Sequence, residues 1–443
     1  MSEILIEGVW QTAQSGAEQL VYNPATLRPV AAAPCCDAHD VVSAMAAAQR
    51  ALESWRARGR EARSALLVEV GRRLSACASA IAELQAQESG QAYRECLDGA
   101  FAAAECFTQL SAPDPSARRH SKLSRGSAAV ARPLLIREDY PLLHWACSAV
   151  PLLQQGSTLV CLAPCAAPLA LLRASRCAAG LPVGVVNMLV ASPEAVKAAL
   201  GGVLLRQPDA PAVEAAPAGS DCVFVGNTID LDLTLAGAAS LRLFHSGQRA
   251  GQNARIYVAQ EMSHELADEL HEYLAFLECG DPCKPSTDLG PLLSSAALQR
   301  VEDQVAQALR RGALLKVGGR RYQPWGLRGY FFQPTLMIEG RGVERAPGEQ
   351  IQGPVVIISP VRNLAEALRH QAAGRVAFFG HDLDVQLRSL VAAGIDFELA
   401  TLTAPLARIV QSFRSAPRGR VRIEHATSDQ PSWFPYRARA TSA

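Results

Sequence analysis

The stretch Leu241–Val258, LRLFHSGQRAGQNARIYV, decides the fold prediction. It contains the pair Gly247-Gln248, and Arg255 stands a little further on, ahead of the apolar residues Ile256 to Val258. Two residues after the glutamine stands Ala250. A methyl group at that place cannot act as a nucleophile, so any covalent chemistry at this turn needs another side chain.

Two polar neighbours of the turn are the first alternatives. Ser246 has no evident base beside it, and His245 has no partner that the sequence identifies. A general base must lie within hydrogen-bond reach of the proton it takes. The interpretation favoured for both residues is therefore local hydrogen bonding.

Composition narrows the class of protein. At 443 residues the chain exceeds what one hydrophobic core supports, which predicts two domains. A net charge of +1 offers no field for nucleic acid or an anionic membrane. No apolar run is long enough to span a bilayer, and the N-terminus MSEILIEGVW lacks a signal-peptide core, which predicts a cytoplasmic protein. The twelve cysteines are expected to be reduced, and no metal site is expected because no histidine has zinc-finger spacing.

Strands and helices are expected to alternate along most of the chain. Strands are predicted in Ile4–Trp10, Gln19–Val30, Ala129–Arg137, Leu159–Leu162, Met188–Val190, Asp221–Val225 and, as an edge strand, Arg420–His425. Helices are predicted from Asp40 onwards and in Glu61–Leu84, Ala92–Gln109, Pro168–Gly180, Pro193–Leu200, Met262–Leu277 and Ser295–Arg311.

Short motifs that contain glycine or proline identify the fold more specifically than the helices and strands do. The motifs are Asn23-Pro24-Ala25-Thr26, Gly180-Leu181-Pro182, Gly184 to Asn187, Gly280-Asp281-Pro282, Asp288 to Leu292, Gly312-Ala313, Gly318-Gly319, Gly329-Tyr330, Pro334-Thr335 and Gly353-Pro354. In combination with Gly247-Gln248 the chain resembles the NAD(P)-dependent aldehyde dehydrogenase superfamily, from about Ile4 to about Ile395. The resemblance implies an α/β fold with a Rossmann-like cofactor domain, an α/β catalytic-type domain and a small oligomerisation arm.

The resemblance also assigns catalytic positions, and the chain departs from the family at each. Ala250 stands where the family has the cysteine that attacks the aldehyde, and Ala216 stands at the general-base glutamate. Asp139 takes the place of an asparagine that donates a hydrogen bond to the oxyanion, which an ionised carboxylate cannot do. Glu214, two residues from the base position, is an alternative base only if the loop is shortened differently.

The cofactor positions differ in the same way. Ala163 and Ala166 stand where the family has a lysine and an acidic residue that bind the adenosine ribose. Gln350 and Gln352 replace a ribose-binding glutamate and a phenylalanine beside the nicotinamide ring. The segment Arg206–Ser220 replaces the glycine-rich phosphate-binding turn. We therefore expect a degenerate site with no bound NAD(P).

These substitutions predict a domain arrangement and a function. Residues 1–112 and 131–236 are assigned to a degenerate cofactor domain, 237–417 to the catalytic-type domain, and 113–130 and 418–443 to an arm, edge strand and tail. The segments Asp139–Leu143 and Ala163–Leu169 resemble the degenerate second half of family 16 aldehyde dehydrogenases. The chain is predicted to be a catalytically inactive structural or regulatory subunit, in a homo- or hetero-oligomer, possibly with an active aldehyde dehydrogenase.

Two alternatives stay open at this point. One is a module that binds a metabolite or a nucleotide in the residual cleft. The other is an oxidoreductase acting on aldehydes with shifted catalytic residues, for example the thiols Cys147 or Cys222. Burial is the expectation for both thiols, since a reactive cysteine needs exposure and a lowered pKa.

Overall fold

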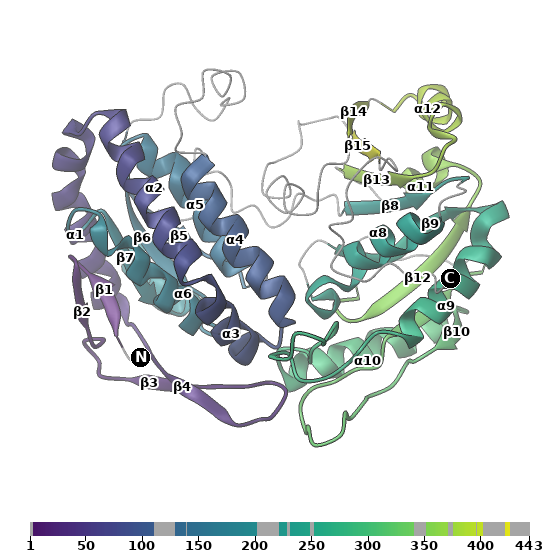
Figure 1. Ribbon diagram of the computed structural model, residues 1–443, viewed down its shortest axis with the longest axis horizontal. Coiled ribbons are helices and arrows are strands. Elements are labelled where there is room, and N and C mark those ends of the chain that lie inside the picture. The colour runs from purple at the N-terminus through teal and green to yellow at the C-terminus, as the bar shows by residue number, and fades with distance from the viewer. Residues whose placement is uncertain are drawn as a thin grey trace. The chain divides into compact units, whose positions relative to one another are not determined.

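The computed structural model describes residues 3–109, 129–138, 140–201, 221–227, 231–248, 252–340, 351–370, 375–395, 397–401 and 421–425. The chain divides into two compact units (Figure 1). Unit 1 contains residues 1–23, 27–89 and 96–214, and unit 2 contains residues 24–26, 90–95 and 215–443. Both units combine helices with a sheet that contains parallel strands, which confirms the predicted α/β class. The predicted domain boundaries stay a prediction.

Unit 1 is built on a sheet with the strand order β2-β1-β7-β6-β5. Strands β5, β6 and β7 are parallel, and β1 pairs antiparallel with both β7 and β2. A separate antiparallel pair joins β3 and β4. The bounds are β1 Ile4–Ile6, β2 Val9–Gln11, β3 Glu18–Tyr22, β4 Pro29–Pro34, β5 Ala131–Leu135, β6 Thr158–Ala163 and β7 Val186–Val190.

The helices that accompany this sheet are α1 Ala38–Ala57, α2 Arg60–Ala76, α3 Ala78–Ser89, α4 Tyr93–Gln109, α5 Pro141–Gln154, α6 Leu169–Ser175 with the 3-10 turn η2 Arg176–Gly180, and α7 Pro193–Leu200. Of these, α5 connects the parallel strands β5 and β6, and α6 with η2 connects β6 and β7, as a βαβ arrangement requires. The prediction of a single helix over Glu61–Leu84 is wrong, because the helix is interrupted at Cys77, which separates α2 from α3.

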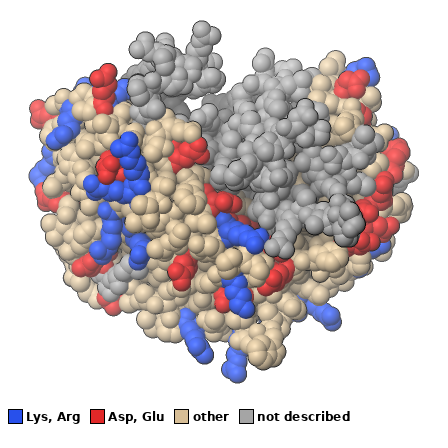
Figure 2. Space-filling model, viewed as in Figure 1, with Lys and Arg blue, Asp and Glu red and all other residues tan. Residues whose placement is uncertain are grey.

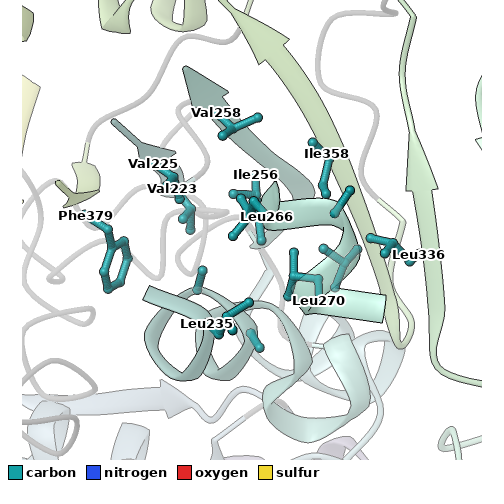
Figure 3. Packing of buried hydrophobic residues seen from close by; sticks show 14 of the residues in the cluster. Val223, Val225, Leu235, Ile256, Val258, Leu266, Leu270, Leu336, Ile358 and Phe379 are labelled. Atoms are coloured by element: carbon teal, nitrogen blue, oxygen red, sulfur yellow. The ribbon is translucent and has the colours of Figure 1, made fainter. Parts of the chain in front are cut away.

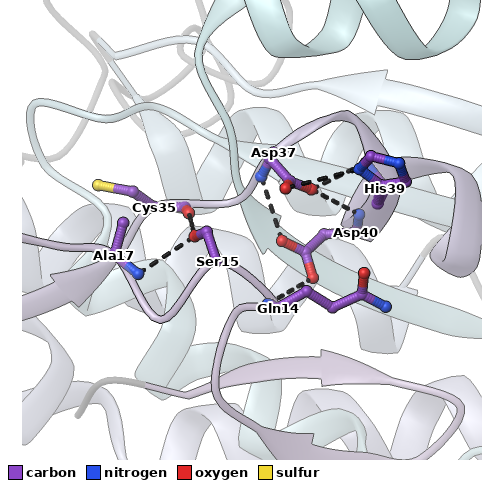
Figure 4. A network of polar contacts seen from close by, with 7 residues as sticks. All are labelled: Gln14, Ser15, Ala17, Cys35, Asp37, His39 and Asp40. Carbon is purple, nitrogen blue, oxygen red and sulfur yellow. Dashed lines mark hydrogen bonds and ion pairs between the residues drawn. The ribbon is translucent and has the colours of Figure 1, made fainter.

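Helix α1 shows how the sequence fixes a helix start. Asp37 accepts hydrogen bonds from the backbone N–H groups of His39 and Asp40, and Asp40 in turn accepts one from the N–H of Asp37 (Figure 4). The other carboxylate oxygen of Asp40 accepts from the N–H of Gln14. This capping box ties the helix to the preceding loop and satisfies N–H groups that no helix can satisfy internally.

Unit 2 is built on a sheet with the order β10-β11-β12-β9-β8-β13-β15-β14. All neighbouring pairs are parallel except β10 with β11. The bounds are β8 Asp221–Val225, β9 Gln252–Ala259, β10 Leu314–Val317, β11 Thr335–Ile338, β12 Val355–Val361, β13 Arg375–Phe379, β14 Phe397–Thr401 and β15 Val421–His425. The prediction of an edge strand at Arg420–His425 is wrong, because β15 pairs with β13 on one side and β14 on the other.

The helices of unit 2 supply its apolar core. Their bounds are α8 Leu231–Leu243, α9 Ser263–Ala275, α10 Ser295–Arg310, α11 Leu364–His370 and α12 Leu383–Ala392, with the 3-10 turns η4 Phe244–Gly247 and η5 Gln260–Met262. Leu235 of α8 and Leu266 of α9 meet Ile256 and Ile358 from the central strands (Figure 3). All four are at most 5% exposed.

Two short early segments belong to unit 2. Residues 24–26 and 90–95 both pack against its glycine motifs. A Cβ on Gly329 would overlap with the backbone of Pro24 and Ala25, and one on Gly290 would overlap with the carbonyl of Gly90. The N–H of Tyr330 donates to the carbonyl of Pro24 at 3.0 Å. The glycines of these sequence motifs therefore lie where two stretches of backbone are in close contact.

The surface carries both signs of charge. Acidic and basic side chains are interspersed over the described part of the face drawn in Figure 2, as a net charge of +1 leads us to expect. Among the helices that the structure describes, none is both long enough and apolar enough to cross a bilayer.

Candidate functional site

The turn that follows α8 has an unusual backbone. His245, Ser246 and Gly247 have φ angles of 52°, 51° and 71°, so three successive residues lie in the left-handed region. Only the glycine adopts this conformation without steric cost, and each of the other two costs on the order of 1–3 kcal/mol. Such strain persists only where the surroundings hold it, and it is concentrated at functional sites.

Close backbone contact explains the glycine. A Cβ on Gly247 would overlap with the carbonyl of Gly353, in the segment Ile351–Val355 that precedes and opens β12. Arg242, the residue before the last of α8, donates from Nη2 to the carbonyl of Val355 at 3.2 Å. Burial lowers the pKa of this guanidinium to about 9. The turn is thus held against the start of β12 by backbone contact and by a buried cation.

A buried carboxylate holds the strained turn from the other side. Glu95, which is 4% exposed, accepts the backbone N–H of His245 at 2.9 Å and the side-chain amide of Gln91 at 3.2 Å. Sequence reasoning missed Glu95, which stands 150 positions before His245. No local pattern at Glu95 indicates a partner at that separation.

Ser246 and Gln248 complete the turn. The Ser246 hydroxyl donates to the carbonyl of Gly290 at 2.8 Å, and the Gln248 side chain accepts the N–H of Leu293 at 2.8 Å. A hydroxyl that donates to a carbonyl is not deprotonated by a base, so this geometry does not activate Ser246 as a nucleophile. Ser246 thus forms a hydrogen bond, as predicted, but its acceptor lies 44 positions away and is not local.

The strand after the turn carries a buried ion pair. Arg255 of β9 donates to Glu339 at 2.9 Å, and Ser359 of β12 donates to the same carboxylate at 2.6 Å. Arg255 and Glu339 are 7% and 3% exposed. This network joins β9, β12 and the residue after β11, which fixes the strand that follows the turn.

In unit 1, the carboxyl edge of the parallel sheet holds the predicted ribose positions. Ala163 ends β6 and is buried, and Ala166 is exposed in the loop that follows. Neither methyl group can form a polar contact with a ribose. The nearby Cys165 thiol has a pKa raised by burial and by the charges of Cys35, Glu138 and Glu194. These described side chains do not fit the family's contacts with a dinucleotide.

The start of α6 at this edge is occupied by protein. Glu88 accepts the backbone N–H groups of Leu169 and Ala170 at 2.6 and 2.8 Å. Burial raises the pKa of Glu88 to about 8, although both N–H contacts oppose the rise. The first N–H groups of α6 therefore serve the protein's own carboxyl group.

Several predicted site residues lie outside the described part of the chain: Ala250, Ala216, Asp139 and Gln350. Gln352 is described and half-buried beside Gly353. Of the two alternative thiols, Cys222 is 1% exposed in β8, as expected. Cys147 is only half-buried in α5, and it lies in unit 1 while Cys222 lies in unit 2.

Two curated relatives cover most of the chain. The NADP(+)-dependent succinate-semialdehyde dehydrogenase of Escherichia coli strain K12 is 25% identical over 83% of this chain and 82% of its own length. The 3-sulfolactaldehyde dehydrogenase of Pseudomonas putida is 26% identical over 90% of both chains. The similarity is therefore not confined to one unit.

Solved structures share the fold. The NAD+ complex of an aldehyde dehydrogenase from Bacillus cereus superposes with a TM-score of 0.76. It is 21% identical, with 95% of this chain and 88% of that chain covered. The aldehyde dehydrogenase fold predicted from the sequence is confirmed.

These relatives overturn two predictions. The prediction of a catalytically inactive structural or regulatory subunit is wrong, because the relatives that cover most of the chain are named as dehydrogenases. The prediction of no cofactor is wrong, because a relative is named as NADP(+)-dependent and a structural neighbour holds NAD+. Both predictions gave substituted positions more weight than the retained framework.

A family model matches most of the chain. The model described as the aldehyde dehydrogenase family matches residues 10–215 and 209–377, which include most of unit 1, a large part of unit 2 and the strained turn. Together with the shared fold, this match shows that the chain belongs to the aldehyde dehydrogenase family.

Proposed function

We propose that the chain is an NAD(P)-dependent oxidoreductase. Its proposed substrates are aldehydes that carry an anionic group at the end opposite the carbonyl. The observation that carries the proposal is the pair of curated relatives. Their names specify a semialdehyde of succinate and a sulfonated lactaldehyde, so both substrates join a short aldehyde to a strong anion. The family membership supports aldehyde chemistry, and the substrate class rests on these names.

We propose that the catalytic residues are shifted from the family's usual positions. The resemblance places Ala250 at the family's nucleophile and Ala216 at its base, and on this assignment no thioester forms through them. An aldehyde also exists as its hydrate, RCH(OH)2, which reaches the acid without a covalent intermediate. Asp139 replaces a hydrogen-bond donor with a proton acceptor, and its carboxylate can take a hydroxyl proton of this hydrate.

Neither alternative thiol is favoured as the nucleophile. Cys222 is enclosed by the apolar cluster that contains Phe224 and Phe378. Cys147 contacts another thiol, Cys106, in unit 1. The hydrate route needs neither of them.

The dinucleotide is proposed to bind without the usual ribose side chains. A bound nicotinamide is a hydride acceptor. Ala163 and Ala166 cannot contribute polar contacts, so backbone groups and residues elsewhere must hold the cofactor. The first test is therefore direct binding of NAD+ and NADP+ to the purified chain by calorimetry.

Turnover is tested with succinate semialdehyde and NADP+, by measuring reduced cofactor and carboxylic acid together. The informative variants are Asp139→Asn, Ala250→Cys and the double variant. We expect Asp139→Asn to lose at least about tenfold in activity, since a general base contributes roughly 10²–10⁴-fold. The double variant restores the family's nucleophile and oxyanion donor, and we expect activity that iodoacetamide abolishes.

The outcomes separate the parts of the proposal. Full activity in Asp139→Asn rejects the hydrate route, and activity lost in Cys147→Ser or Cys222→Ser assigns the chemistry to that thiol. Cofactor binding with no turnover of any anionic aldehyde rejects the substrate class. Absence of cofactor binding rejects the function as a whole.

The remaining questions are the oligomeric state of the protein and its place in the cell. Family members are commonly oligomeric, and we propose an oligomer here, either of this chain alone or with a second aldehyde dehydrogenase. The mass of the native complex distinguishes the two. We also propose a cytoplasmic location, because the many cysteines of the described residues form no structural disulfide, as is usual in a reducing compartment.

A further inference from the structure

Two cysteines from different helices of unit 1 lie in contact. The Sγ atoms of Cys106 on α4 and Cys147 on α5 are 3.3 Å apart, so the two helices contact each other at this point. A disulfide has an S–S distance of about 2.0 Å. Closing the pair therefore requires the two sulfur atoms to approach each other by about 1.3 Å.

The packing around the pair holds the sulfur atoms together. Phe107 and Trp145, which stand beside the two cysteines in the chain, pack with ring centroids 5.2 Å apart. On the other side of α4, the backbone of Gly71 in α2 approaches so closely that a Cβ there would lie 2.8 Å from the carbonyl oxygen of Ala104. The contact is thus part of a tightly packed helix layer.

The two thiols differ in access to solvent. Cys106 is 4% exposed, while Cys147 is half-buried. A reagent in solution therefore meets Cys147 first, and Cys106 is placed to react with whatever Cys147 has bound. This division into an attacked thiol and a resolving thiol is what an exchange reaction requires.

We propose that Cys106 and Cys147 form a reversible redox-modification site that takes small-molecule disulfides. The Cys147 thiolate attacks a disulfide RSSR, a Cys147–SR bond forms, the RS–SR bond breaks and RS⁻ leaves. The Cys106 thiolate then attacks Sγ of Cys147 and expels the second RS⁻. Two protein thiols lose two protons and two electrons, and RSSR is reduced to two RSH.

The bond would have a defined mechanical effect. It closes a ring between positions 106 and 147, and it ties α4 to α5, the helix that begins at Pro141 directly after the segment containing Asp139. Cross-links of this kind stabilise a protein mainly by restricting its unfolded chain. The inference stands independently of the proposed function, because the modification itself is measured.

The experiment treats the reduced, full-length protein with oxidised glutathione and maps the cysteines by mass spectrometry. We expect a cross-linked peptide pair containing Cys106 and Cys147, with two hydrogens lost and full reversal by dithiothreitol. Tm should rise by roughly 5–10 °C. Cys106→Ser should instead retain a glutathione adduct on Cys147, and Cys77→Ser, which removes an exposed thiol, should behave like the unchanged protein.

A stable glutathione adduct on Cys147 of the unchanged protein would overturn the proposal, because it would show that Cys106 does not resolve it. So would cross-links among other cysteines, or no loss of thiols from this pair. The mapping uses the unchanged protein, so the test does not depend on whether a variant folds.

Discussion

The turn at His245–Gly247 in unit 2 and the sheet edge at Ala163–Ala166 in unit 1 differ in what they keep. The turn retains its strained backbone, its glycine contact with Gly353 and its buried partner Glu95. The edge has a regular strand and loop, and its predicted ribose-binding positions, Ala163 and Ala166, carry only methyl groups. A substitution in the turn would therefore cost contacts that hold the fold, whereas the two alanines of the edge have no polar contact to lose.

The largest effect is expected at the glycine contact. Gly247→Ala places a Cβ into the carbonyl of Gly353 at a φ of 71°. We expect a loss of more than about 3 kcal/mol in the free energy of unfolding, or failure to fold. The control is Gly312→Ala, where φ is 96° but no atom lies within 4 Å, with an expected loss of about 1 kcal/mol. Equal urea midpoints for the two variants would contradict the packing argument.

The buried partner of the turn should matter less. Glu95→Ala leaves the N–H of His245 buried without its acceptor, which costs roughly 1–3 kcal/mol in the free energy of unfolding. Glu95→Gln keeps an oxygen that can accept the N–H, so its loss should be smaller. Thermal denaturation of both variants checks the order. If the glutamine variant is the less stable, the charge of Glu95 matters more than its geometry.

A pH-dependent effect is expected in unit 1. The pKa of Glu88 rises from 4.5 to about 8 because of burial. Between these pH values the folded protein keeps a proton that the unfolded chain has released, so this group makes stability fall as pH rises. Glu88→Gln cannot ionise, and its stability relative to the unchanged protein should therefore increase by up to a few kcal/mol from pH 4.5 to pH 8. A difference that stays constant over this window would show that the buried carboxyl group does not titrate there.

The smallest effect is expected at the sheet edge. Ala163→Lys together with Ala166→Glu returns the two ribose-binding side chains, and we expect NADP+ to bind roughly tenfold more tightly by calorimetry. Ala166→Glu alone is the control and should change affinity little. Weaker binding in the double variant would show that the cofactor lies elsewhere.

The sequence predicted the fold well because its signals are local. Strand and helix periodicity placed most elements, and the glycine motifs marked contacts such as that of Gly290 with the carbonyl of Gly90. The interruption of the helix at Cys77 was not predicted, because no glycine or proline stands there to indicate a helix end. The position of β15 was missed because alternation along a strand carries no information about how many neighbours the strand has.

The site was predicted less completely, for a related reason. Glu95 bonds to His245 across 150 positions, and Glu339 bonds to Arg255 across 84 positions. Neither the segment around the glutamate nor the segment around its partner contains a pattern that indicates such a distant pair. Substituted positions such as Ala163 could be identified only by resemblance. What those substitutions mean for activity was misjudged, since the loss of one contact does not exclude another way of binding the same cofactor.

The two early segments that belong to unit 2, residues 24–26 and 90–95, determine when unit 2 can complete its folding during synthesis. During synthesis they leave the ribosome long before Gly290 and Tyr330, the residues they pack against. Unit 2 therefore cannot finish folding until nearly its whole length has emerged, and contacts of such long range slow folding. A fragment that starts after unit 1 would lack both segments, so the catalytic-type unit should be produced only as part of the full-length chain.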